Sequence, residues 1–248
     1  MRKEVLKEPT FEKEIAVMIR VSKSMDEMRE QLKAYHDNDI AQSLKYLNRA
    51  ERNLLYSGLD AKWLAEIMSY LDDPASYIEE IGIDKLAEII NEMEADDAVD
   101  LWEEIDESVK VKLRPMLDDE KKMDILLINS YDEDEIGSLI TTNYIRIKQN
   151  LSIRQAMHEL VQQAGENDNI TTLYVVDDRG RFCGAIDLKD LIVARENVAL
   201  DSLISYAYPY LLDHEKISDS IEKIKDYAED SLPVLNKDKK IIGIITAQ

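Results

Sequence analysis

Hydrophobic and polar positions along the chain follow two different periods, and the change falls near residue 136. Before this point, apolar residues recur every three or four positions, which is the period of an amphipathic helix. After it, apolar runs of strand length alternate with helix-length segments and polar turns. The pattern predicts a multi-domain protein with an all-α front half and an α/β back half.

The front half is a succession of short predicted helices separated by acidic residues, glycine or proline. Residues 1–36 predict one or two N-terminal helices, with Pro9 as a boundary. Between residues 37 and 135 the helices are about ten residues long, too short to be stable alone, so we expect them to stack. Residues 111–130 are the exception, because they predict one longer helix with Pro115 as a potential break.

A repeat within this half supports the stacking. The segment Leu64–Met68, LAEIM, returns 22 residues later as Leu86–Ile90, LAEII. Self-similarity at this period, with two short helices per unit, is typical of stacked helical hairpins. We therefore expect a right-handed superhelix of helical hairpins.

The back half contains one short module twice, at a separation of 59 residues. LYVVDDRGRFCGAID, from Leu173, aligns with LPVLNKDKKIIGIIT, from Leu232, and each predicts strand, turn and strand. Ser152 caps a helix before the first copy, and Asp187 and Thr246 are expected to cap the helices that follow the two copies. Each module is thus predicted to be β-α-β-β-α.

The boundaries of these elements follow from the apolar runs. The first copy predicts strands at 144–148, 173–176 and 182–186, and the second predicts a helix at 217–227 and strands at 232–235 and 241–245. The second copy reaches Gln248 before its closing helix, which would leave apolar sheet exposed. We therefore expect this sequence to be a piece of a longer protein.

Charge narrows the possible partners. The chain has 248 residues, of which 31 are Lys or Arg and 52 are Asp or Glu, and its formal net charge is -21. Like charges repel, so nucleic acid and anionic membrane surfaces are disfavoured as partners. A cationic partner is favoured.

Other residue types exclude several classes of protein. Cys183 is the single cysteine, which excludes an internal disulfide and predicts a buried structural thiol in a reducing compartment. The three histidines form no cluster and no catalytic set is recognisable, so we expect no enzyme activity, and Trp63 and Trp102 are expected in the core. No apolar run of membrane-spanning length and no signal peptide is present, so we expect a soluble, cytoplasmic chain.

Both halves resemble known families. GRFCGAIDLKDL and KKIIGIITAQ resemble the CBS (cystathionine β-synthase) module, which occurs in tandem pairs. DIAQSLKYL, LAEIMSYL, LAEIINEM, DDAVDLWEEI and YDEDEIGSLIT resemble the cytosolic N domain of MgtE-type magnesium transporters. The resemblance implies an N domain at 37–135, a first CBS domain at 136–203 and a second, truncated one at 204–248.

The same resemblance implies partners and location. It implies Mg²⁺ as ligand, a homodimer formed through the CBS domains, and a C-terminal transmembrane domain that follows in the longer protein. The chain would then lie at the cytoplasmic face of the cell membrane.

Candidate metal ligands gather on one predicted helix. Asp96, Asp97 and Asp100 are spaced three and four residues apart, so their carboxylates share a face, and Mg²⁺ prefers such oxygen ligands. Asp96 and Asp97 equally suit the positive end of the helix dipole. The resemblance implies magnesium ligation by Asp96 or Asp97 together with Asp100, and by Glu66, although Glu66 could also simply face solvent. It further implies a main-chain contribution at Gly137–Ser138.

The second CBS module departs from the family pattern. It has Lys216 and Ser218 where family members carry acids near the start of the first helix. Asp213, Glu215 and Asp219 lie close by and could substitute.

CBS pairs often bind adenine nucleotides, with a Ser or Thr and an Asp holding the ribose. The candidates for binding ATP or another adenine nucleotide are Thr172, Asp187, Lys189, Asp190 and Thr246. The alternative for Asp187 and Thr246 is that they serve only as helix caps.

The leading hypothesis is a cytosolic magnesium-sensing region that regulates the gate of a magnesium transporter. Mg²⁺ would bridge acidic faces of the N and CBS domains and favour a compact, closed state. The main alternative is a soluble adenine-nucleotide sensor whose helical half is a protein-binding scaffold. An enzyme with appended CBS modules is the third alternative.

Overall fold

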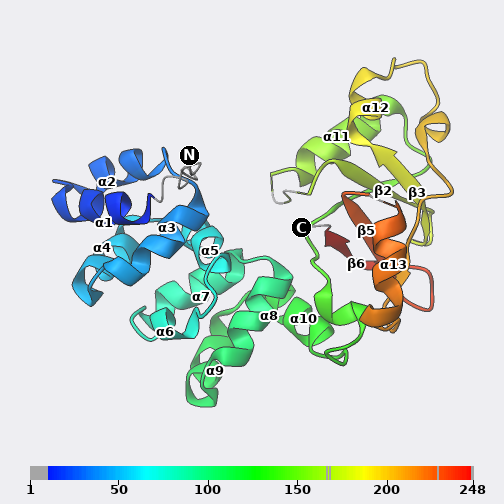
Figure 1. Cartoon of the computed structure of the whole chain (residues 1–248). Coiled ribbons are helices and arrows are strands. Elements are labelled where there is room, and N and C mark those ends of the chain that lie inside the picture. The colour runs from blue at the N-terminus through cyan, green and yellow to red at the C-terminus, as the bar shows by residue number, and fades with distance from the viewer. Residues whose placement is uncertain (1–10, 166, 168, 228, 247–248) are drawn as a thin grey trace, which may run out of the picture. The chain divides into compact units, whose positions relative to one another are not determined.

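The computed structural model describes residues 11–165, 167, 169–227 and 229–246 (Figure 1). The chain forms two compact units. The first contains the residues up to Met93 together with Asp100–Lys122, and the second contains Glu94–Val99 and the chain from Met123 onward. Among the described residues, no helix has both the length and the apolar character needed to cross a membrane.

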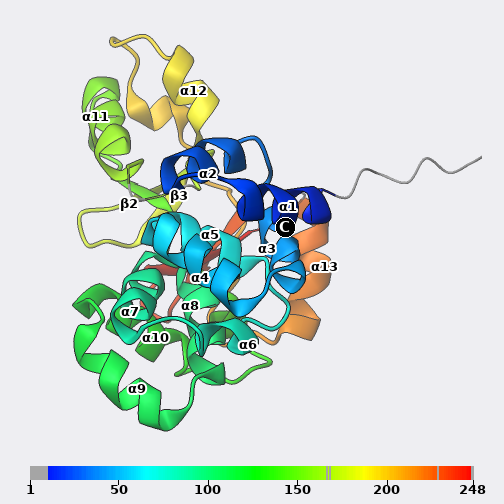
Figure 2. The same cartoon turned by 90° about the vertical axis from the view of Figure 1, so that its left-hand side faces the viewer.

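The first unit is helical, as its sequence predicts, and alternate helices stack on each other. Helices α1, α3, α5, α7 and α9 each pack on the next member of this series, and α2 packs on α4. Figure 2 shows these short helices following one another, from α1 in blue to α9 in green. The helices of the front half are α1 Glu12–Val21, α2 Met25–Leu32, α3 Asp37–Ser43, α4 Arg49–Gly58, α5 Ala61–Ser69, α6 Ala75–Ile78, α7 Ile83–Glu92, α8 Ala95–Glu104, α9 Glu107–Leu113 and α10 Asp119–Ile128. Residues 95–99 of α8 and 123–128 of α10 belong to the second unit.

The repeated segments LAEIM and LAEII form the centres of α5 and α7, which pack against each other. Their equivalent residues Leu64 and Leu86 are both buried, as are Ile67 and Ile89. Several helix starts carry a side-chain cap, for example α4, where the side chains of Asn48 and Glu51 form a reciprocal capping box. Where such a cap is present it marks where the helix begins, and the repeated apolar face sets how α5 and α7 stack.

Two expectations for local structure were wrong, and one was right only in part. The potential break at Pro115 is confirmed, so residues 111–130 do not form one long helix: Pro115 lies in a 3₁₀ turn, Arg114–Met116, that separates α9 from α10. Trp63 is only half-buried, since its indole N–H donates to Asp37 Oδ1 at 2.6 Å near the surface. Cys183 is also half-buried, although its partial burial still raises the pKa of the thiol.

The second unit contains two three-stranded sheets of identical topology. In each, the first and second strands are parallel and the second and third are antiparallel. Both hairpins carry an irregularity at the equivalent place, between Val175 and Val176 and between Val234 and Leu235. The strands are β1 Ile145–Lys148, β2 Thr172–Val176, β3 Phe182–Asp187, β4 Leu211–Leu212, β5 Ser231–Leu235 and β6 Ile241–Thr246.

Helices complete the first module as β-α-β-β-α, with α11 Ile153–Gln163 and α12 Leu188–Val193. The second module has α13 Ile217–Tyr227, with the bounds that the sequence predicts. The strand β4 has no counterpart in the sequence prediction, because two residues are too few to show an alternating pattern. The cap expected of Thr246 concerns residues beyond 246, which lie outside the described part of the chain.

In each module, a segment from elsewhere in the chain pairs with the last strand of the β-hairpin. Ser205 pairs with Ala185 of β3, and Thr141 pairs with Ile244 of β6. The glycines next to these pairs make the crossings possible. A Cβ on Gly184 would lie 2.5 Å from the Ser205 carbonyl oxygen, and one on Gly243 would lie 2.7 Å from Ile140 Cβ and 2.9 Å from the Thr141 carbonyl oxygen. No other residue type fits without displacing the backbone.

Candidate functional site

The three acids predicted as metal ligands lie on α8. Asp96 and Asp97 belong to the first turn, and Asp100 follows one turn later. Asp96 and Asp97 are half-buried, whereas Asp100 is exposed. Loss of water around the Asp100 carboxyl nevertheless raises its pKa. A cation near this carboxylate would replace the missing water and reverse that shift.

The other predicted ligands lie on different elements. Glu66 is half-buried on α5. Gly137 and Ser138 belong to a 3₁₀ turn, Ile136–Leu139, where the Gly137 N–H donates to the Asp213 carbonyl oxygen at 2.8 Å. The Ser138 hydroxyl donates to the Glu135 carbonyl oxygen, also at 2.8 Å. Both donors are therefore engaged, and the oxygens that could still contact a metal here are the main-chain carbonyls and the lone pairs of Ser138 Oγ.

The predicted ligands offer carboxylate and carbonyl oxygens, which are the type of ligand atom that Mg²⁺ prefers. Within the described ranges, no group of three or more His, Cys, Asp or Glu side chains is arranged to hold a metal ion. Mg²⁺ usually keeps several waters and binds through one or two carboxylates. Neighbouring carboxylates on α8 meet this weaker requirement, and the predicted ligand set remains a prediction.

The second CBS module meets the linker 131–138 through opposite charges. Lys216 Nζ pairs with Asp134 Oδ1 at 2.6 Å, and His214 Nδ1 lies 3.1 Å from Glu135 Oε1. The bond to Asp134 raises the pKa of Lys216. The Asp132 N–H, and after it His214, lower the pKa of Glu135. Lys216, at a position where the resemblance implies an acid, therefore supplies a cation to the linker.

Asp213 is the most enclosed of the nearby acids suggested as substitutes. It is 8% exposed, and its Oδ2 accepts from the Tyr131 hydroxyl at 3.3 Å. Burial raises the pKa of the Tyr131 hydroxyl to about 12, and the charge of Asp213 adds to this shift. Both groups hold the linker against the module.

The candidate nucleotide residues gather at strand ends. Thr172 at the start of β2 pairs with Asp187 at the end of β3. In the second module, Ser231 and Thr246 occupy the equivalent paired positions. Tyr174 connects the modules, because its buried hydroxyl lies 2.6 Å from Ser231 Oγ. The sequence analysis did not name Ser231 as a candidate, although the alignment of the two copies makes it equivalent to Thr172.

The capping alternative for Asp187 is realised in this structure. Its Oδ1 accepts from the Lys189 N–H at 2.7 Å, which caps α12. Lys189 and Asp190 lie exposed in the first turn of the same helix. A carboxylate that caps a helix can still accept from a ribose hydroxyl through its second oxygen, so both roles remain compatible.

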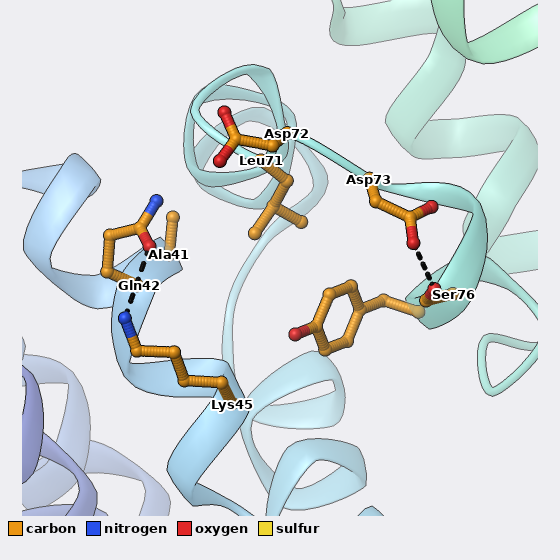
Figure 3. A pocket seen from close by; sticks show the side chains of 8 residues that line it. Ala41, Gln42, Lys45, Leu71, Asp72, Asp73 and Ser76 are labelled. Carbon is orange, nitrogen blue, oxygen red and sulfur yellow. Dashed lines mark hydrogen bonds between the residues drawn. The ribbon is translucent and has the colours of Figure 1, made fainter.

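A cavity of about 180 Å³ lies elsewhere, in the helical unit (Figure 3). At its edge Lys45 Nζ donates to Gln42 Oε1 at 3.5 Å and pairs with Glu12 at 3.1 Å, and Asp73 accepts from the Ser76 hydroxyl. None of the predicted site residues lines it. The lining residues are Ala41, Gln42, Lys45, Leu71, Asp72, Asp73, Ser76 and Tyr77.

Comparison with known families accounts for both halves of the chain. The family model of the MgtE intracellular N domain matches residues 35–134. The model of the CBS domain matches residues 136–197 and 201–248. The chain is an MgtE N domain followed by a tandem CBS pair.

Two relatives of this chain are named as magnesium transporters. MgtE of Thermus thermophilus is 25% identical over 224 residues, which cover 88% of this chain and 50% of that protein. MgtE of Enterococcus faecalis is 29% identical over 242 residues, which cover 95% and 53%. The chain thus spans about half the length of the curated relatives it matches.

Two crystal structures match nearly all of this chain. The soluble part of a magnesium transporter is 28% identical, with a TM-score of 0.89 and coverage of 96% of this chain and 95% of that one. The cytosolic domain of the Mg²⁺ channel MgtE in complex with ATP is 25% identical, with a TM-score of 0.84 and coverage of 93% and 96%. These matches confirm the expected order of a helical N-terminal region and a CBS pair.

Proposed function

We propose that this chain is the cytosolic, magnesium-sensing region that regulates the gate of an MgtE-type magnesium transporter. The match of 96% of the chain to the soluble part of a magnesium transporter carries the proposal. A regulatory rather than catalytic role follows from the same homology. In the intact protein, the partners would be Mg²⁺, a second copy bound through the CBS domains, and the protein's own transmembrane domain.

The proposed mechanism uses charge. The formal net charge of -21 makes acidic surfaces repel one another at low Mg²⁺. Mg²⁺ that bridges acids of the N domain and the CBS pair would favour a compact state and close the pore. It can do so only to the extent that it binds the compact state more tightly than the open one.

A magnesium titration of the chain tests this proposal. Small-angle scattering should show a decreasing radius of gyration, and calorimetry should show saturable binding. KCl at equal ionic strength should not reproduce the effect, because monovalent ions screen charge without bridging carboxylates. An unchanged radius and no heat of binding with millimolar Mg²⁺ would contradict the proposal.

Paired variants test the predicted ligands. Asp96→Asn with Asp100→Asn should weaken the Mg²⁺ response about tenfold, since Mg²⁺ binds through one or two carboxylates. Asp26→Asn with Glu30→Gln removes the same charge from α2, where both acids are exposed and paired with Arg29 and Lys33. Equal weakening in the two double variants would show that net charge, not these ligands, controls the response.

We also propose that the CBS pair binds ATP or a related adenine nucleotide. The ATP complex of a structure that matches 93% of this chain supports this, as does the pairing of Thr172 with Asp187. Asp187→Ser separates the two roles of this residue, because serine keeps a helix cap but lacks the carboxylate. Calorimetry with ATP should show weaker binding by Asp187→Ser with unchanged thermal stability. No heat of binding by the unaltered chain would reject nucleotide binding.

A further inference from the structure

The segment Ile140–Asn143 is fixed to the CBS pair. Ile140 and Thr141 are 0% and 3% exposed. The Thr141 N–H donates to the Ile244 carbonyl oxygen at 3.0 Å, and the Ile244 N–H donates to the Thr141 carbonyl oxygen at 2.9 Å. Two residues further on, the chain enters β1. This short segment is therefore anchored to a strand of the second module and leads directly into the first.

The side chains of this segment hold the residue that precedes α8. Thr141 Oγ1 donates to Glu94 Oε2 at 3.0 Å, and Asn143 Nδ2 donates to Glu94 Oε1 at 2.7 Å. The Glu94 carbonyl oxygen accepts the first helical hydrogen bond of α8, from the Ala98 N–H at 2.9 Å. These bonds lie within one compact unit, because Glu94–Val99 belongs with the CBS pair. One carboxylate thus joins the start of α8 to the segment between the modules.

The hydrogen bonds of Glu94 can transmit a movement of α8 to the segment Ile140–Asn143. Hydrogen bonds to a charged acceptor are stronger than neutral ones, and two donors on one carboxylate fix its orientation. Glu94 stands two and three residues before Asp96 and Asp97, so a cation on those acids lies within a turn of it. Any change in the position of the first turn of α8 must then act on Thr141 and Asn143.

We propose that Glu94, held by Thr141 and Asn143, is the positioning residue through which ion binding on α8 is coupled to the CBS pair. This inference rests on the proposed magnesium-sensing function. Coupling between two sites is reciprocal, so if the bound ion favours the arrangement in which Thr141 and Asn143 hold Glu94, these hydrogen bonds raise the affinity of α8 for the ion by the same factor. Weakening these bonds should lower Mg²⁺ affinity although no metal ligand has changed.

The test compares variants of the donors in the full chain. Thr141→Val keeps the side-chain shape but removes the hydroxyl, and should weaken Mg²⁺ binding in calorimetry about tenfold. Thr141→Ser keeps the hydroxyl and should restore the affinity to within about twofold. A purely structural role would lower thermal stability without Mg²⁺ and leave the affinity unchanged.

Thr142→Val is the matched control. Thr142 Oγ1 donates to Asp124 Oδ2 on α10 at 3.2 Å, so this variant removes a similar bond from the same segment but not from Glu94. It should leave Mg²⁺ affinity unchanged. If the unaltered chain binds Mg²⁺ and Thr141→Val binds it equally well, the coupling role is overturned and the proposed function stands. If the unaltered chain does not bind Mg²⁺, both are overturned.

Discussion

The two CBS modules have the same topology but are completed by different parts of the chain. The segment that crosses the first module, at Ser205, comes from the connection between the modules. The segment that crosses the second, at Thr141, comes from the linker that follows the N domain. The linker that follows the N domain therefore pairs with the second module, although the first module is closer to it in sequence.

Contacts of the linker extend this difference. The Gly137 and Ile136 N–H groups donate to the Asp213 and Glu215 carbonyl oxygens, at 2.8 and 2.9 Å. Lys216 adds its ion pair with Asp134. The repeated sequence thus produces two equivalent sheets. Residues outside the repeat bind the linker, and they do so at the second module in each of these contacts. Four predictions test this difference, from the largest effect to the smallest.

The largest effect is expected at the crossing glycines. Gly184→Val and Gly243→Val should each reduce the free energy of unfolding by about 3 kcal/mol, because the new side chain overlaps a crossing segment. Gly243→Val should in addition expose residues 140–143 to hydrogen exchange, since it displaces the linker segment. Urea unfolding and exchange mass spectrometry measure the two effects. Gly82→Ala is the control, because a Cβ there meets no atom within 4 Å.

A smaller effect is expected at the contact between the modules. Tyr174 is fully buried among the rings of Tyr144, Phe182 and Tyr208. Tyr174→Phe leaves the Ser231 hydroxyl without this partner, and should cost about 1–2 kcal/mol in urea unfolding. Ser231→Ala should cost a similar amount, and combining the two should cost less than their sum. Full additivity would show that the bond contributes nothing.

The hairpin turns differ at one equivalent position. Gly180 has a φ of +76° in the first module, where the second has Lys239 at +60°. Left-handed backbone costs a residue with a Cβ about 1 kcal/mol. Gly180→Lys should therefore lower the melting temperature and Lys239→Gly should raise it. Opposite signs in the two modules are the expected result, and equal signs would contradict this account.

The smallest effect concerns the residue that begins each turn. Asp177 accepts from the Arg179 and Arg181 N–H groups at 2.8 and 2.9 Å, while neutral Asn236 accepts the equivalent bonds in the second module. The Arg181 N–H, with the Arg181 side chain, lowers the pKa of Asp177 below 3.8.

The sign of the pH dependence follows from that lowered pKa. Asp177 contributes stability that is present above pH 3.8 and lost as pH falls through its folded pKa. Asp177→Asn should reduce the slope of unfolding free energy against pH in this window. Asn236→Asp should steepen it. An unchanged slope in Asp177→Asn would show that its bonds do not favour the charged form.

Local elements could be predicted because their signals are local. The helix Ile217–Tyr227 and the cap at Ser152 follow from periodicity and from side chains that bond their own backbone. The potential break at Pro115 is equally local, because proline lacks the N–H that continues a helix. β4 was not predictable, since a two-residue strand exists only because β5 lies beside it.

The candidate site likewise combines features that local sequence predicts with contacts between residues far apart in the chain. Spacing alone places Asp96, Asp97 and Asp100 on one helix, and repetition alone predicts two similar modules, because neither signal needs a distant partner. Glu94 meets Thr141 and Asn143, and Thr141 lies across β6, only once the chain has folded. Those contacts join residues more than 40 positions apart. Such pairs depend on how all intervening elements pack, and no local pattern of residues encodes them.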